Sequence, residues 1–179
     1  MLLPHHPARS AHATSHPRLA SLRARGAVLA ALLPLAVLTA CGSDAVEVDS
    51  PTLSAGDRET CEEFLDDLPE ELAGLPPAEV DPSDAPARAW GDGLAVVCGV
   101  PEPEELAPAS ECDVVAGVAW FVPPNQRDDG EDLVATAVET TPRVALVVPA
   151  EYRGQVSFDA FGELVEPIGT HLETTRRCR

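Results

Sequence analysis

The stretch Leu38-Thr39-Ala40-Cys41 most constrains which part of this chain can form a folded domain. It ends an apolar run that begins at Gly26. Arginines precede the run, and no acidic residue occurs before Cys41. This charged and then apolar order is typical of a secretory signal, and the run is shorter than the about 20 apolar residues of a membrane-spanning helix. The last four residues have the form of a bacterial lipoprotein signal, in which the cysteine is acylated. The alternative is an ordinary signal peptide cleaved after Ala40, with Cys41 a plain thiol.

Removing 40 of the 179 residues leaves 139, which is enough for one domain with a hydrophobic core. We therefore expect a signal peptide at 1–40, a flexible acidic tether at 41–58 and a single domain at 59–179. After residue 40 there are 30 acids, eight arginines and no lysine, so the formal charge of that part is −22. Because such a chain repels phosphate backbones, we expect it to bind no nucleic acid.

An even number of cysteines remains after Cys41, which predicts two disulfides in an exported chain. These cysteines are Cys61, Cys98, Cys112 and Cys178. Three pairings are open to them, and we favour Cys98 with Cys112 because they are close in sequence, which leaves Cys61 for Cys178. The alternative is a metal site, but the cysteines form no C-x-x-C pair and His171 is the only histidine after residue 40. We therefore expect no metal.

Two segments have helical spacing of apolar residues. The first is Cys61–Leu72, with acidic residues on its other face, a capping residue expected at Thr60 and a kink expected at Pro69. The second spans 157–172, and Pro167 within it predicts a bend. Both helices are amphipathic, so each is expected to pack one face on the rest of the domain.

Apolar runs predict strands at 94–100, 114–122, 133–140 and 144–148, whereas the Pro- and Asp-rich segment 75–89 is typical of a loop. The short connections between the strands favour antiparallel neighbours. The expected fold is α+β, a single small antiparallel sheet of about four strands with an N-terminal and a C-terminal helix packed on one face and two disulfides.

Few residues indicate a site. Trp90 and Trp120 adjoin predicted strands, and a buried core position is the favoured interpretation of each. If Trp90 is instead exposed beside Arg88 and Gly91, these three residues would form a binding surface, because exposed aromatic and arginine side chains are enriched at interfaces. The acidic run 128–132 lacks the alternating ligand spacing of an EF-hand, so we interpret it as a solvated hairpin tip.

No nucleophile motif is present: the chain after residue 40 has no G-x-S-x-G, S-x-x-K or H-E-x-x-H. We expect no catalytic residue and no cofactor. The favoured function is a non-catalytic module, anchored through Cys41 to the outer face of the cell membrane, that binds an envelope protein or a wall component. The alternative is a hydrolase that acts on envelope glycans or peptides through a pair of carboxylates, as glycosidases do.

Short segments spread along the domain carry a resemblance to a known family. They are Cys61–Pro69, Ala89–Gly91, Val97–Pro101, Gly117–Trp120, Val147–Pro149 and the cysteine near the end of the chain. In this order they resemble the actinobacterial lipoproteins of the DUF3515 family over residues 59–179. The resemblance implies a lipid-anchored envelope protein and no assigned activity, substrate or catalytic residue. The family tends to place Arg before Pro ahead of the last strand, whereas here Pro142 precedes Arg143, so no role is carried over to that arginine.

Overall fold

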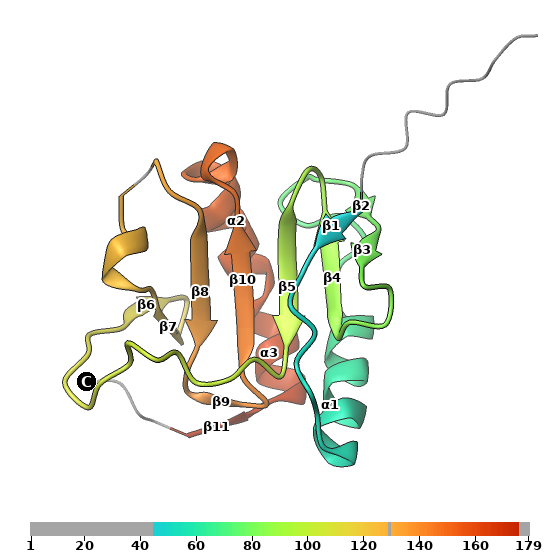
Figure 1. Ribbon diagram of the computed structural model, residues 1–179, viewed down its shortest axis with the longest axis horizontal. Helices are drawn as coiled ribbons and strands as arrows, with labels where there is room; N and C mark the ends of the chain where they lie inside the picture. The colour runs from blue at the N-terminus through green and yellow to red at the C-terminus, as the bar shows by residue number, and fades with distance from the viewer. Residues whose placement is uncertain (1–44, 129, 176–179) are drawn as a thin grey trace, which may run out of the picture. The chain divides into compact units, whose positions relative to one another are not determined.

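A computed structural model of the protein describes residues 45–128 and 130–175. Its main feature is a seven-stranded sheet in which every neighbouring pair is antiparallel (Figure 1). In spatial order the strands are β2 (Pro77–Ala78), β4 (Ala87–Trp90), β5 (Leu94–Cys98), β10 (Val144–Val148), β8 (Leu133–Ala137), β7 (Val118–Phe121) and β6 (Asp113–Val115). The expectation of a small sheet of about four strands is therefore wrong.

The remaining elements are short strand pairs and helices. Strand β1 (Val46–Glu47) pairs with β3 (Val80–Asp81), and β9 (Thr140–Thr141) pairs with β11 (Glu173–Thr174). The helices are α1 (Ala55–Asp66), α2 (Gln155–Glu163) and α3 (Val165–His171), with 3-10 turns η1 (Pro124–Gln126) and η2 (Ala150–Tyr152). No helix within residues 45–128 or 130–175 is long and apolar enough to cross a membrane.

One expected strand, 114–122, is in fact a hairpin. Ala116 and Gly117 form a two-residue turn with φ values of 50° and 93°, and this turn joins β6 to β7. Positive φ at both central residues is the geometry of the tight turns that join antiparallel strands. As a result Val114 pairs with Ala119 and points to the opposite face of the sheet from Trp120.

The segment expected as a loop, 75–89, contributes β2, β3 and most of β4. Alanine has a low strand propensity, yet β4 pairs along its whole length with β5, and both Ala89 and Trp90 are buried. Tertiary packing therefore overrides local preference in this strand. Part of the expected tether is ordered as well, because β1 and the first residues of α1 lie within 41–58.

Helix α1 begins six residues earlier than its apolar spacing predicts. Ser54 is the capping residue, and its hydroxyl oxygen accepts a hydrogen bond from the backbone N–H of Asp57, so Thr60 lies inside the helix. The C-terminal helical segment is confirmed but divided: α2 ends at Glu163 and α3 starts at Val165, two residues before Pro167. Proline at this place is compatible with a first turn, where its missing N–H is not needed.

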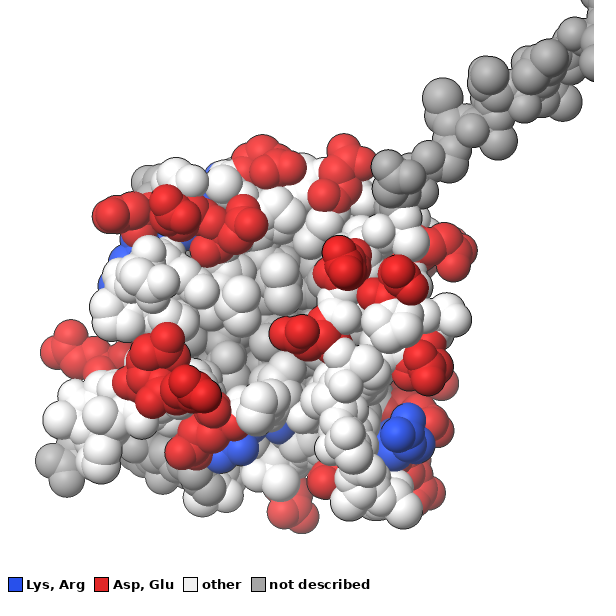
Figure 2. All heavy atoms as spheres, viewed as in Figure 1, with Lys and Arg blue, Asp and Glu red and all other residues white. Residues whose placement is uncertain are grey.

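The hydrophobic core lies between the sheet and the helices, which Figure 1 shows behind the sheet. Alternate residues of the central strands face it, including Leu94, Val96, Leu146 and Val148, together with Phe64 of α1. On the opposite face the segment that follows β1 crosses in front of β5 (Figure 1). Acidic residues surround a centre of uncharged residues on that face (Figure 2), as expected for a chain with 30 acids.

The disulfide between described cysteines joins Cys61 of α1 to Cys98 of β5, with their Cα atoms 5.6 Å apart. Both expected pairings are therefore wrong. Cys98 faces the helices, whereas the chain from 99 to 112 runs away toward β6, so closeness in sequence was misleading. Cys112 is disulfide-bonded too, and because Cys61 and Cys98 bond each other, its partner lies outside the described residues. Cys41 and Cys178 also lie outside them.

Candidate functional site

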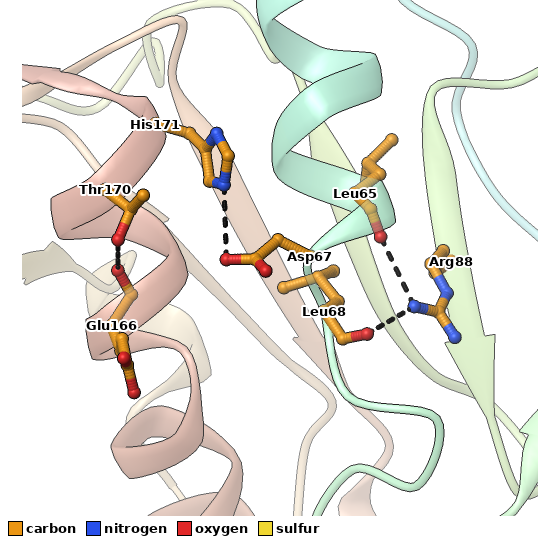
Figure 3. Close-up of polar contacts among 7 residues, drawn as sticks. All are labelled: Leu65, Asp67, Leu68, Arg88, Glu166, Thr170 and His171. Atoms are coloured by element: carbon orange, nitrogen blue, oxygen red, sulfur yellow. Dashed lines mark hydrogen bonds and ion pairs between the residues drawn. The ribbon is translucent and has the colours of Figure 1, made fainter.

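Arg88 and Trp90, which the sequence suggested as part of a binding surface, instead pack against the end of α1. We call Arg88, Trp90 and the end of α1 the closed corner. Arg88 Nη1 donates to the backbone oxygens of Leu65 at 3.3 Å and Leu68 at 2.6 Å (Figure 3). The carbonyl groups at a helix C-terminus lack partners within the helix and carry partial negative charge, so a cation there is stabilising. The guanidinium also lies 5.2 Å from the centre of the Trp90 ring.

Trp90 is fully buried, so the condition for an exposed aromatic anchor is not met and the core interpretation is confirmed. Its indole N–H donates to the backbone oxygen of Glu70 at 3.0 Å. Gly91 has a φ of 56°, and a Cβ at this position would lie 2.7 Å from the Tyr152 hydroxyl oxygen, which accepts from the N–H of Asp92. Glycine at 91 is therefore explained by the turn and by this close approach.

A concavity, which we call the side pocket, lies at the other end of the sheet, where β6, β7 and α2 meet. Its volume is about 500 Å³, within the range of small-molecule and side-chain sites. It is lined by residues of the β6–β7 hairpin, the β7–β8 connection, β8 and α2: Asp113, Val115, Trp120, Val122, Arg127, Leu133, Arg153, Gly154, Ser157, Phe158 and Phe161.

The wall of the side pocket is mainly apolar. Trp120 and Phe161 meet edge to face with their ring centres 4.9 Å apart, and Val122 and Leu133 are buried beside them. Phe158 lies one helical turn before Phe161 and 67% of its surface is exposed. An exposed phenylalanine beside a buried aromatic wall is a surface that gains hydrophobic free energy when a partner covers it.

Polar groups converge on the same place. Arg127 and Asp113 form an ion pair at 3.1 Å, and both side chains are about half exposed. Arg153 Nη1 donates to the backbone oxygens of Gln126 at 2.7 Å and Glu131 at 3.0 Å, which holds the β7–β8 connection against α2. The lining thus carries two arginines and one carboxylate, the reverse of the charge balance of the chain as a whole.

The indole N–H of Trp120 is buried and has no hydrogen-bond partner among the residues that the structure describes. Leaving a buried donor unpaired costs about 1–3 kcal/mol, and such groups are uncommon in native proteins. Trp120 is among the residues that line the side pocket. Trp120 and Trp90 are equally buried, and of the two only Trp90 has a hydrogen-bond partner in the described part of the chain.

The side pocket contains no arrangement for nucleophilic catalysis. Its one lining hydroxyl, on Ser157, donates to the backbone oxygen of Gly154 at 2.8 Å, and no histidine is among the lining residues. Activation of serine needs a neighbouring base. What the geometry offers is an apolar wall, a donor and a charged rim, which are the components of a binding site.

A second concavity, the acidic groove, lies where the end of α1 meets α2 and α3. It is lined by Asp67, Glu163 and Glu166 and has a volume of about 530 Å³. Asp67 Oδ2 lies 3.2 Å from Nε2 of His171 (Figure 3), and Glu163 accepts a hydrogen bond from the N–H of Ala73 at 3.1 Å. All these carboxylates are exposed. Among the described parts of the chain no cluster of acids, histidines and cysteines could hold a metal ion.

The side pocket was not predicted from the sequence, although its components could have been noticed. Arg127 and Arg153 are two of only eight arginines after residue 40, and Phe158 begins the aromatic spacing of the last helix. The site was missed because segment 114–122 was expected to be one continuous strand, with Val114 and Trp120 on the same face. The hairpin places them on opposite faces instead. The acidic run 128–132 does join the antiparallel neighbours β7 and β8, so its interpretation as an exposed connection between them is confirmed where it is described.

Fold and pockets together define a helix-backed antiparallel sheet domain with a binding-type pocket at one end of the sheet. Residues 25–176 match the family described as Protein of unknown function (DUF3515), and the chain belongs to that family. No curated protein and no solved structure matches the chain.

Proposed function

We propose that this protein is a lipid-anchored protein of the cell envelope that binds an extracytoplasmic partner in the side pocket and catalyses no reaction. The observation that carries the proposal is the side pocket itself. Its apolar wall includes Trp120, whose N–H has no partner in the part of the chain that the structure describes, and the exposed Phe158 lies at its side. The anchor at Cys41 rests on the lipoprotein signal in the sequence.

The location is tested by changing Cys41 to alanine. Acylation of this thiol is what would hold the domain at the membrane, so we expect Cys41→Ala to move the protein from the membrane fraction to the soluble fraction. The N-terminal peptide of the wild-type protein should carry a diacylglycerol by mass spectrometry. A wild-type protein that is found wholly in the medium without lipid would overturn the anchored location.

The binding role is tested by site-specific photo-crosslinking in intact cells. A photoreactive amino acid at Phe158 should capture the same partner in repeated experiments. The matched control is the same amino acid at Glu62, an exposed position on the outer face of α1. A partner captured at both positions, or at neither, would count against the side pocket as a binding site.

The second candidate function is a carboxylate-dependent hydrolase, and the acidic groove is the place that favours it. Three carboxylates line one concavity, His171 contacts one of them, Asp67, and glycosidases use two carboxyl groups about 5–10 Å apart. Against this, each carboxylate is exposed, and two of them already accept hydrogen bonds within the fold. Release of reducing ends from purified cell walls by the wild-type protein, and its loss in Glu166→Gln, would support the hydrolase over the binding module.

A further inference from the structure

Strand β6, which forms part of the rim of the side pocket, indicates what class of molecule binds there. This inference rests on the proposed binding function. Strand β6 is at one end of the seven-stranded sheet and, among the described residues, pairs only with β7. The outer edge of such a strand presents unpaired N–H and C=O groups, which is a template for another extended chain.

The hairpin geometry identifies which backbone groups face outward. In a two-residue hairpin the flanking residues, Val115 and Val118, form the first hydrogen-bonded pair, and hydrogen-bonded and non-hydrogen-bonded pairs then alternate. Val114 and Ala119 are therefore a non-hydrogen-bonded pair. The N–H and C=O of Val114 point away from β7, toward the open edge.

An exposed apolar side chain lies near this edge on each face of the sheet. Among the described residues, the large apolar side chains that are exposed are Val114 at 68% and Phe158 at 67%. Asp113 and Val115, which flank Val114, line the side pocket together with Phe158, whereas Val114 itself points to the other face. A strand added to β6 would cover Val114 with one side chain and reach the side pocket with the next.

We propose that the partner is a protein that adds an extended segment to β6 and inserts a large apolar side chain into the side pocket. Backbone hydrogen bonds then provide affinity and the pocket provides selectivity, as in other cases of strand addition. Arg127 is half exposed on the rim, so a carboxylate two residues from the apolar side chain of the segment, on the same face, would lie close to its charge.

The test uses synthetic peptides and the indole N–H signals of the protein. The probes are acetyl-Thr-Asp-Thr-Leu-Val-Thr-amide and the same residues in reverse order, because the added strand can run in either direction. The chain has two tryptophans, so a proton–nitrogen NMR spectrum shows two indole signals. We expect the Trp120 signal to shift on binding, while the Trp90 signal, bonded to Glu70, stays in place.

The decisive variant is Val114→Pro, which removes the outward N–H and leaves the hydrogen bonds between β6 and β7 intact. We expect it to weaken peptide binding about tenfold or more, corresponding to the loss of one hydrogen bond and its alignment. Val114→Thr, which keeps the backbone N–H, is the matched control and should bind within a few-fold of the wild type. An unchanged Trp90 signal shows that each variant is folded.

A second measurement needs no variant. A peptide with its backbone nitrogens methylated keeps the leucine and the aspartate but cannot donate to β6, so it should not shift the Trp120 signal. Acetyl-leucine has the apolar group and a carboxylate without a strand. If acetyl-leucine or the methylated peptide binds as well as the free peptide, the site takes a small molecule and strand addition is wrong.

Other outcomes separate this inference from the proposed function. If photo-crosslinking at Phe158 captures a partner but no peptide binds, the binding function stands and strand addition fails. If neither experiment gives a signal, both fail. Sedimentation of the protein alone reveals self-pairing: dimers that Val114→Pro abolishes would mean that a second copy of this chain occupies the edge, which also overturns the inference.

Discussion

The two ends of the sheet contain the same residue types in opposite states. At the closed corner, Trp90 donates to a backbone oxygen and Arg88 donates to two carbonyl groups at the end of α1. At the side pocket, the N–H of Trp120 has no partner among residues 45–128 and 130–175, and Arg127 is half exposed beside Asp113. A buried tryptophan with an arginine nearby thus connects two elements of the fold at one end and lines the side pocket at the other. Hydrogen-bond satisfaction distinguishes them, and residue type does not.

The largest effect is expected from the disulfide that fixes α1 at the closed corner. Replacing both Cys61 and Cys98 by alanine opens a loop of 37 residues, which should lower the free energy of unfolding by about 4 kcal/mol in the chain-entropy model. Urea denaturation of the purified wild-type protein and variant measures this loss of unfolding free energy. A loss below 1 kcal/mol would mean that other contacts hold α1 to β5.

The two arginines give the next comparison. Arg88→Met should cost about 2–3 kcal/mol of unfolding free energy, because the carbonyl groups of Leu65 and Leu68 lose a charged donor. Arg127→Met is the matched control and should cost less than about 1 kcal/mol, since exposed ion pairs contribute little. Equal losses in urea denaturation would contradict the distinction between the two ends.

Much of the central sheet could be predicted, and the reason is burial on both faces. Strands β5 and β10 are continuous apolar runs, and β8 is apolar except for Thr136. The sequence predicts all three, with the bounds of β10 correct and the ends of β5 and β8 placed two and three residues too late. The hairpin at Ala116 and the alanine-rich strand β4 could not be predicted in the same way. Their structures depend on a positive φ at an alanine and on pairing with β5, and neither leaves a periodic pattern.

The candidate site was less predictable than the fold for a related reason. A site is defined by which side chains meet, and the sequence separates Trp120 from Phe161 by about forty residues. The cysteine pairing failed similarly, because Cys61 and Cys98 are brought together by α1 packing on β5. Arg88 and Trp90 were noticed for their types, but only the structure shows that their hydrogen bonds are already used.

The tryptophans themselves provide a matched pair of substitutions. Trp90→Phe and Trp120→Phe remove the same atoms from two fully buried sites, so their cavity costs should be similar. Only Trp90→Phe also breaks a hydrogen bond and leaves the oxygen of Glu70 unpaired, so it should be the more destabilising by about 1–2 kcal/mol. The reverse order in thermal or urea unfolding would show that the Trp120 N–H is satisfied within the fold.

The smallest effect on stability is expected at Phe158, and here a small value is the informative result. Phe158 is 67% exposed, so Phe158→Ala should change the free energy of unfolding by less than about 0.5 kcal/mol. Phe161 lies on the same helix and also lines the side pocket but is buried, so Phe161→Ala should cost about 3–5 kcal/mol. An aromatic side chain that contributes nothing to folding, next to one that the fold requires, is expected where the surface is covered by a partner. Phe158→Ala should therefore leave unfolding unchanged and weaken peptide binding, and a variant that binds as well as the wild type would remove Phe158 from the binding surface.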